Sequence, residues 1–227
     1  MTSREIRVRV LPGLTPYAEG LALQRELADA RRAGAAPDTL LVIEHPPVIT
    51  LGRSAAAEGV LADPATLAAL GVEVHRIERG GQATWHGPGQ IVGYPISDIG
   101  ALGLGVAAWV RALEETMIRA AAALGVAAGR RPGFVGVFTE RGKIGAVGVR
   151  VSRRVSFHGF ALNVDPDLSY YRLIVPCGMS DIPVTSIAAA RGRAPSMNEA
   201  RQAIIDAFLD VAARTRISRP ASPNRAP

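Results

Sequence analysis

The chain has 227 residues, and 48% of them are hydrophobic, which is enough apolar material for one sizeable core without metals or disulfides. No run approaches the ~20 apolar residues of a membrane-spanning helix, and the first ten residues lack the apolar segment of a secretory signal. A single cysteine excludes an internal disulfide, so the sequence predicts a cytoplasmic protein that does not bind membranes.

Hydrophobic periodicity and turn residues predict the elements of the first half of the chain. Thr15 is the expected cap of the first helix, with Pro16 in its first turn. In chain order the elements are a strand at residues 6–11, a helix between Thr15 and Gly34, strands at residues 40–44 and 48–51, a helix at residues 63–70, a strand at residues 72–77, a glycine-rich loop at residues 80–89 and a strand at residues 91–96.

The second half continues the alternation of helices and strands. Its final helix begins at a capping box, in which Ser196 is followed three residues later by Glu199. The elements are a helix at residues 106–124, strands at residues 133–139, 144–151 and 155–164, an irregular stretch at residues 165–186, and the final helix to residue 214. Hairpins mixed with separate helices predict the α+β class: a single domain with a mixed, largely antiparallel sheet and flanking helices, not a doubly wound nucleotide fold.

The formal net charge of +6 comes mostly from the C-terminal end. Residues 214–227 hold four arginines, three prolines and no acidic residue, so the remainder of the chain carries only +2. This composition predicts a disordered tail at residues 214–227 after a folded domain at residues 1–213. The tail is either a solvated terminus or a segment that attracts an acidic protein partner. The nearly balanced charge of the remaining chain argues against a nucleic-acid-binding function.

The basic residues have one unusual feature, because 25 of them are arginine and only Lys143 is lysine. Either type serves on a solvated face, but a guanidinium keeps its proton at any working pH. Lys143 is therefore either a surface lysine at a position where arginine would serve equally well, or a group whose amine must lose and accept a proton.

A glycine-rich segment at residues 79–90 contains four glycines, which allow the backbone to approach a ligand closely. Arg79, Thr84 and His86 would stand around that surface. The segment lacks the Gly-Lys-Ser/Thr ending of a Walker loop and the Rossmann fingerprint. It is either a ligand-binding loop or a turn-rich connection.

Two later segments combine strand character with unusual residues. Residues 142–149 alternate around small residues, which predicts a strand with one face kept open for something close by. His158 and Asn163 interrupt an otherwise apolar strand and must find partners if they are buried. His158 is either a structural core histidine or a functional group.

Cys177 lies between Pro176 and Gly178, in a loop-like region where a thiol can be approached. A free thiol with a pKa of about 8.5 is mostly protonated at pH 7, so a nucleophilic role requires a nearby cation or base. If buried, the same side chain would serve as a small hydrophobe. The sequence has no Cys-x-x-Cys or His-Glu-x-x-His spacing for a metal and no Gly-x-Ser-x-Gly elbow for a serine hydrolase.

Five strings occur in order across residues 40–187: Glu44-His45-Pro46-Pro47-Val48, residues 79–90, Gly142-Lys143-Ile144-Gly145, residues 158–163 and Pro176-Cys177-Gly178. Together they resemble the lipoyl(octanoyl) transferases of lipoate synthesis. Trp85 stands where that family more often has another aromatic residue, and Phe138 where tryptophan is common. Both differences keep a bulky ring.

The resemblance implies the fold of biotin and lipoate protein ligases, with residues 1–213 as the catalytic acyltransferase domain. It implies octanoyl transfer from acyl carrier protein to a lysine ε-amine of lipoyl domains, in 2-oxoacid dehydrogenases and the glycine cleavage H protein. Cys177 would carry the octanoyl group as a thioester, and Lys143 would lower the pKa of that thiol and shuttle protons. No cofactor, metal or ATP is implied, because the donor arrives activated.

The resemblance also implies an acyl site. The acyl chain needs an apolar channel, for which Val147 and Phe160 are suitable side chains. The residues that would line the site are Arg79, Gly80, Gly81, Gln82, Ala83, Thr84, Trp85, His86, Ala146, Val147, Gly148, Gly159, Phe160 and Ala161.

Three other functions remain open from the sequence. The first is an ATP-dependent lipoate or biotin ligase on the same fold, which needs no cysteine. The second is an amidotransferase that moves octanoyl between lipoyl domains, and it differs in its donor. The third is a nucleic-acid-binding module, for which Trp85 and Trp109 are too few to form an aromatic platform.

Overall fold

The computed structural model describes residues 5–56, 59–175 and 182–217. Its strands and helices alternate along the chain in the manner of an α+β protein. In order they are β1 (Ile6–Leu14), α1 (Tyr17–Arg32), β2 (Asp38–Glu44), β3 (Val48–Leu51), α2 (Pro64–Ala69), β4 (Glu73–Arg76), β5 (Ala83–His86), β6 (Gln90–Asp98), α3 (Val106–Ala123), β7 (Val137–Thr139), β8 (Gly142–Ser152), β9 (Val155–Asn163), the 3-10 helix η2 (Leu168–Leu173), α4 (Ile187–Arg191) and α5 (Met197–Ile217).

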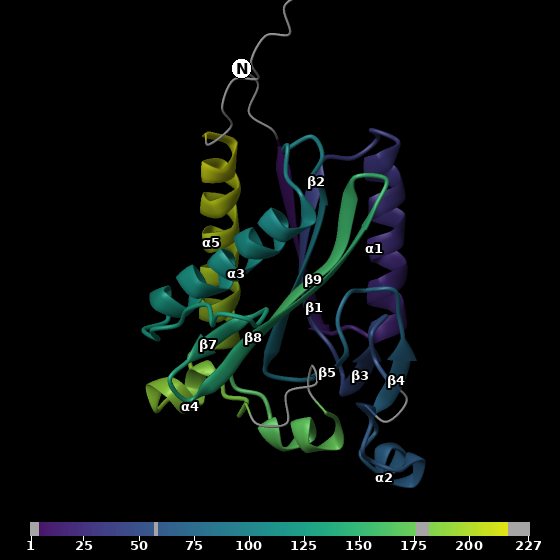
Figure 1. Ribbon diagram of the computed structural model, residues 1–227, viewed down its shortest axis with the longest axis vertical. Coiled ribbons are helices and arrows are strands. Elements are labelled where there is room, and N and C mark those ends of the chain that lie inside the picture. The colour runs from purple at the N-terminus through teal and green to yellow at the C-terminus, as the bar shows by residue number, and fades with distance from the viewer. Residues whose placement is uncertain (1–4, 57–58, 176–181, 218–227) are drawn as a thin grey trace, which may run out of the picture.

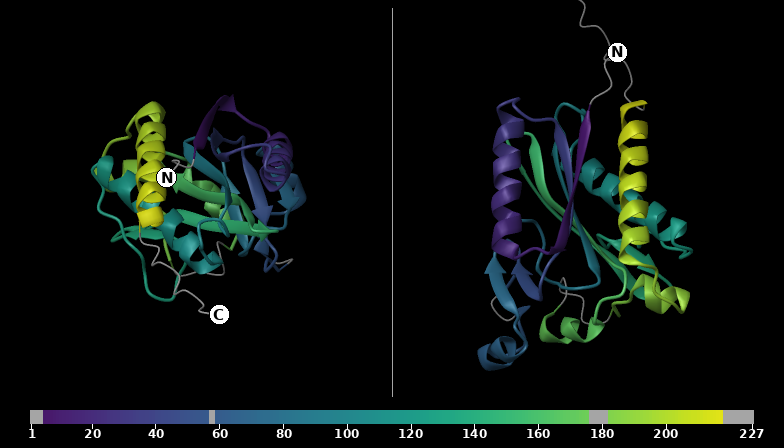
Figure 2. Two further views of the ribbon diagram at one scale, coloured as in Figure 1. Left: turned by 90° about the horizontal axis from the view of Figure 1, so that it is seen from above. Right: turned by 180° about the vertical axis from the view of Figure 1, so that it is seen from behind.

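A six-stranded sheet forms the centre of the molecule (Figure 1). Its strand order is β1-β2-β6-β9-β8-β7; β1 and β2 are parallel, and the other neighbours are antiparallel. Helix α1 covers one face of this sheet, and α3 and α5 cover the other, as the views from the two sides show (Figures 1 and 2). The fold is therefore three layers, with the large sheet in the middle.

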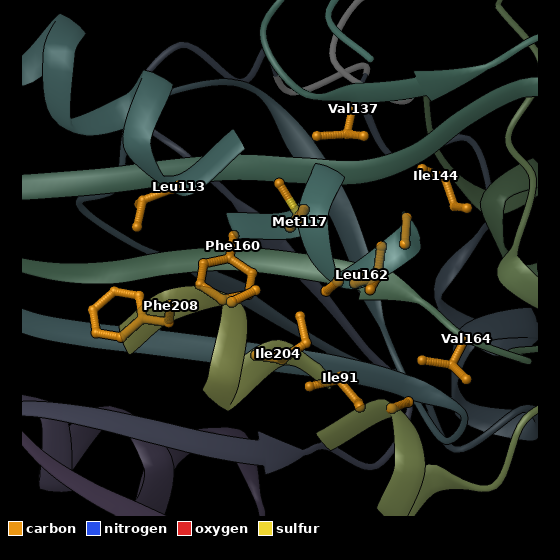
Figure 3. Packing of buried hydrophobic residues seen from close by; sticks show 14 of the residues in the cluster. Ile91, Leu113, Met117, Val137, Ile144, Phe160, Leu162, Val164, Ile204 and Phe208 are labelled. Atoms are coloured by element: carbon orange, nitrogen blue, oxygen red, sulfur yellow. The ribbon is translucent and has the colours of Figure 1, made fainter. Parts of the chain in front are cut away.

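The main core lies between the large sheet and helices α3 and α5 (Figure 3). Leu113 and Met117 are four residues apart, so both lie on the face of α3 that packs on the sheet. The residues labelled in this core are Ile91, Leu113, Met117, Val137, Ile144, Phe160, Leu162, Val164, Ile204 and Phe208. The labelled residues alone come from six different elements, so this cluster holds the strands in register and makes the sheet a rigid support for its opposite face.

A smaller sheet, with strand order β4-β3-β5, lies beyond the N-terminal end of α1 on the same side of the large sheet (Figures 1 and 2). It has its own apolar cluster, in which Ile49, Leu67 and Trp85 are buried. The Trp85 ring stacks on Tyr170 of η2 with centroids 5.2 Å apart. The two sheets thus face each other, and the candidate site lies between them.

Pro95 interrupts the pairing of β6 with β9 in the middle of the large sheet. The pairing is regular as far as Gly93 and resumes at Ser97. Proline has no N–H to donate to the ladder, which is why it is rare in central strands. In this gap His158 has a left-handed backbone with φ of 56°, and its N–H donates to Gln24 Oε1 of α1 at 2.9 Å. The helix thus satisfies a strand N–H that the neighbouring strand leaves without an acceptor.

The structure confirms the predicted α+β class and most of the predicted elements to within a few residues. The capping box is confirmed, because the Glu199 carboxylate accepts from Ser196 N–H at 2.8 Å and Glu199 N–H donates to Ser196 Oγ at 3.2 Å. The predicted cap of the first helix is wrong. Pro16 holds that position without a side-chain hydrogen bond, and Thr15 N–H donates to the Glu44 carbonyl instead.

Other differences concern the loops. Strand β5 lies inside the predicted glycine-rich loop, because it pairs with β3. Strand β7 is shorter than predicted, and Gly136 N–H before it donates to Glu114 Oε1 at 2.8 Å. Helix α5 continues to Ile217, past the predicted start of the tail. Among the described residues, no helix combines the length and apolarity required to cross a bilayer.

Candidate active site

The floor of the candidate site is a patch of four small residues on the β8–β9 pair. Ala146 lies directly opposite Ala161, and Gly148 lies directly opposite Gly159. Directly paired residues point to the same face of a sheet, so these four form one continuous strip. All four line a cavity between the two sheets. The strip leaves room above the sheet where larger side chains would fill it.

The segment that begins at Arg79 lies over this floor. Gly80 N–H donates to the Val149 carbonyl on the free edge of β8 at 3.0 Å. A Cβ on Gly148 would lie 3.0 Å from Arg79 Cδ and 3.1 Å from the Gly80 carbonyl oxygen. We call this segment, residues 79–82, the roof. It approaches the floor closely because position 148 has no side chain.

Arg79 itself is buried, with 7% of its surface exposed. Its Nη2 donates to the Thr50 carbonyl at 2.7 Å and to Thr50 Oγ1 at 2.9 Å, and its Nη1 donates to the Gly80 carbonyl at 3.0 Å. These bonds fix a cation at the wall of the cavity.

Strand β5 divides the predicted lining residues into two sets. Thr84 and His86 line the cavity, whereas Ala83 and Trp85 point into the apolar cluster of the small sheet. This division follows from the alternation of side chains along a strand. Trp85 was predicted to line the acyl site, but the structure buries its ring at 1% exposure in that cluster.

The remaining predicted residues of this segment take part through the main chain. The Gly81 carbonyl accepts from Ser54 N–H, and the Gln82 carbonyl accepts from Gly52 N–H, both at 3.2 Å. Gly81 borders the cavity, whereas Gly80 and Gln82 do not line it. These bonds join the roof to the end of β3.

Val147 and Phe160 border the cavity, but their side chains do not form its apolar lining in the predicted way. They are directly opposite each other on β8 and β9 and alternate with the floor residues. The Phe160 ring packs in the main core on the other face of the sheet (Figure 3). Both side chains belong to that core, and the small floor residues face the cavity instead.

The cavity has further lining residues that the sequence analysis did not assign: Tyr17, Val92, Tyr94 and His158. Tyr17 opens α1, and Tyr94 lies on β6, so only the register of α1 and β6 brings them here. His158 was noted in the sequence as a histidine in an apolar strand, which is the signal that could have found it.

Three buried histidines lie at or next to the cavity and are neutral: His86 and His158 line it, and the His45 ring lies 6.0 Å from the His86 ring. His45 Nδ1–H donates to the Thr15 carbonyl at 2.7 Å, which leaves Nε2 to accept from Tyr94 Oη at 2.8 Å. Burial lowers the pKa of His45 to about 4, of His86 to about 3 and of His158 to about 4. Since a buried imidazolium would lose its hydration, each ring is uncharged at neutral pH.

Lys143 lies at the other end of the floor. It lines a small pocket with Gly145, Ala146 and Thr84, and the last two also line the main cavity. Its side chain is buried, with Nζ 5.7 Å from the centroid of the Phe138 ring. The floor therefore leads from the main cavity to the only lysine of the chain.

A chain of hydrogen bonds connects the two pockets. His86 Nδ1–H donates to Gln90 Oε1 at 2.6 Å, and Gln90 Nε2 donates to Asn163 Oδ1 at 2.9 Å. Asn163 Nδ2 donates to the Thr185 carbonyl at 2.9 Å, and Thr185 N–H donates to the Lys143 carbonyl at 2.9 Å. These bonds anchor the segment at residues 182–186 to both β8 and β9. Asn163, noted in the sequence as a polar residue needing partners, is the centre of this network.

Cys177 and its neighbours Pro176 and Gly178 lie outside the described residues. The chain is described again from Ile182, and Pro183 O accepts from Lys143 N–H at 2.8 Å. The segment that follows Cys177 in sequence thus runs beside Lys143. In the part of the chain that the structure describes, no three histidine, cysteine or acidic side chains gather as a metal site would require.

Sequence comparison identifies the family. A model of the lipoyl protein ligase A/B catalytic domain matches residues 16–209. The chain belongs to the lipoyl protein ligase A/B catalytic domain family. Within it, the octanoyltransferase of Koribacter versatilis is 46% identical over 201 residues, which cover 86% of this chain and 80% of that protein.

Solved structures of lipoate and biotin protein ligases share the fold of this chain. A bipartite lipoate protein ligase from Thermoplasma acidophilum has a TM-score of 0.64 at 20% identity, over 92% of this chain and 85% of its own. A biotin protein ligase from Aquifex aeolicus, in complex with biotin and ATP, has a TM-score of 0.56 at 11% identity, over 93% of this chain and 72% of its own. The predicted biotin and lipoate ligase fold is confirmed.

Proposed function

We propose that this family member is an octanoyltransferase of protein lipoylation. It would transfer octanoyl from acyl carrier protein to a lysine ε-amine of lipoyl domains, through a thioester on Cys177. The observation that carries the proposal is the strip of small residues from Gly159 to Ala146, which lines the cavity and ends at the pocket of the buried Lys143. The similarity to curated octanoyltransferases supports the choice of acyl group.

The chemistry requires two transfers. In the first, the Cys177 thiolate attacks the donor thioester, a new thioester forms on Cys177, and the thiol of the carrier leaves. Exchange of one thioester for another is nearly balanced, so this step needs mainly a thiolate and an acceptor for its proton. Lys143 is our candidate for that acceptor.

In the second transfer, the amine of the acceptor lysine attacks the thioester on Cys177. An amide forms, the thiol of Cys177 is restored, and the amine loses a proton. Lys143 would exchange that proton with Cys177, so the same buried amine serves both steps. An ATP-derived adenylate is unnecessary, because the thioester of the donor is already activated.

The acyl chain itself would lie on the floor, beneath the roof segment. Of the residues predicted for this role, Arg79, Gly81, Thr84, His86, Ala146, Val147, Gly148, Gly159, Phe160 and Ala161 line the cavity. The alanine methyl groups and the glycine backbone offer an apolar surface that leaves room for an aliphatic ligand. The lipoyl-domain acceptors, the carrier donor and a cytoplasmic location are parts of the same proposal.

The test is mass spectrometry of the intact protein after incubation with octanoyl-acyl carrier protein in the absence of ATP. We expect an octanoyl adduct that maps to Cys177 and disappears when a lipoyl domain is added. Octanoylation that survives Cys177→Ala, or that appears only with ATP and free octanoate, would instead support a ligase on this fold.

Lys143→Arg and Lys143→Met separate charge from proton transfer. Arg keeps the charge but cannot give up its proton, so both variants should lose at least about a hundredfold in kcat. Lys143 Cε lies 2.7 Å from the position of a Cβ on Gly136, so urea unfolding must accompany the kinetics to exclude a packing defect. Near-normal turnover of a stably folded Lys143→Arg protein would remove the proton-transfer role.

A further inference from the structure

His158 is the most unusual residue around the cavity. It is 1% exposed, it has a left-handed backbone, and its Nε2 finds no hydrogen-bond partner among the described residues. A left-handed backbone is strained for any residue with a Cβ, and a buried polar atom without a partner is costly.

One contact fixes the backbone of His158, and a second contact packs against its ring. The N–H of His158 is held by Gln24 Oε1 at 2.9 Å, and its ring stacks on Phe157 with centroids 4.9 Å apart and planes inclined by 27°. Pro95 gives the opposite strand no N–H there. The imidazole is therefore fixed at the cavity by elements on both of its sides.

The position of His158 along the floor matches the length of the proposed acyl group. His158 lies directly opposite Val149, whereas the end of the floor nearest Lys143 is Ala146. Three residues of strand span about 10 Å. An extended eight-carbon chain is about 9 Å long, at ~1.3 Å of rise for each carbon–carbon bond. A chain whose carbonyl lies at the Lys143 end would therefore place its last carbon beside the imidazole.

We propose that His158 is the residue that determines acyl chain length, by closing the far end of the cavity with a polar ring. The proposal rests on the octanoyl transfer proposed above. A chain of eight carbons stops short of the imidazole, whereas each added methylene must displace the ring. Displacing the ring disturbs its stacking on Phe157, and the bond from the His158 N–H to Gln24 holds the backbone that carries it.

The test compares donors in competition. Carrier thioesters of six to fourteen carbons are mixed at equal concentration with a lipoyl domain, and the acylated products are counted by mass spectrometry. The wild-type protein should favour eight carbons. His158→Gly removes the ring and suits the left-handed backbone, and it should shift the ratio of ten-carbon to eight-carbon product upward by about tenfold.

A second variant keeps the proposal testable if the glycine protein is unstable. His158→Asn also tolerates a left-handed backbone but retains a shorter polar group, so it should shift the same ratio by a smaller factor. A wild-type chain-length profile in both variants would overturn the role of His158. Failure of the wild-type protein to transfer any acyl group would instead overturn the proposed function.

Discussion

The three buried histidines at or next to the cavity should make the protein sensitive to mild acid. His45, His86 and His158 have native pKa values of about 4, 3 and 4, lowered mainly by burial. In the unfolded chain each imidazole binds a proton near pH 6.5. The unfolded state therefore binds more protons than the native state between pH 6.5 and 4, and the free energy of unfolding must fall as the pH falls through that window.

The magnitude follows from the displaced pKa values. Each histidine lowers the free energy of unfolding by about 2 kcal/mol between pH 7 and pH 5, so the three together remove about 6 kcal/mol. That loss is comparable with the whole stability of a typical domain. The carboxyl groups whose pKa is lowered, such as Glu115 beside Arg119 and Asp210 beside Arg214, contribute only at lower pH.

The assay is urea unfolding at a series of pH values, followed by tryptophan fluorescence. His45→Gln provides the comparison, because it should reduce the slope of the free energy of unfolding against pH by about one-third, whatever its effect at pH 7. A free energy of unfolding that stays constant from pH 7 to pH 5 would refute the reasoning. So would an unchanged slope in the His45→Gln protein.

Three further predictions concern packing, the network and a helix end. Gly93→Ala would put a Cβ 2.3 Å from the Phe160 ring, so urea unfolding should show a loss of about 1–3 kcal/mol. Asn163→Ala leaves the Thr185 carbonyl without its donor. Steady-state kinetics should show kcat reduced by at least about tenfold, with the KM for octanoyl-acyl carrier protein nearly unchanged. Ser196→Ala removes the capping box of α5 and should cost about 1 kcal/mol in thermal unfolding, with activity unchanged at low temperature.

The sequence predicts the floor of the site well, because the information is local. The alternation of small residues around Ala146 and Gly148 has the period of a strand, and it correctly predicts one open face. The same period explains what was predicted wrongly. Residues 80–89 read as loop because of their glycines, so Trp85 was grouped with Thr84 although a strand turns them to opposite faces.

Other features depend on partners far along the chain and leave no local pattern. Pro95 reads as part of an ordinary strand, and its effect appears only because β9 pairs there. Tyr17 and Tyr94 reach the cavity through the packing of α1 on β6, which no spacing in the sequence encodes. Lys143 became a candidate because it is the only lysine and because of the resemblance to a family, whereas its burial beside Phe138 is known only from the fold.

The β8–β9 hairpin has a consequence for how the cavity assembles. Its two strands meet at a tight turn, where Arg153 and Arg154 have φ of 48° and 72°, and together they supply the whole floor and His158. A hairpin of this kind closes in about 1–10 μs, whereas the roof must return from a distant part of the chain and forms more slowly. We therefore expect the floor to form before the roof. Partial unfolding should reverse that order, so that amide protons of the roof exchange with solvent while those of the floor are still protected.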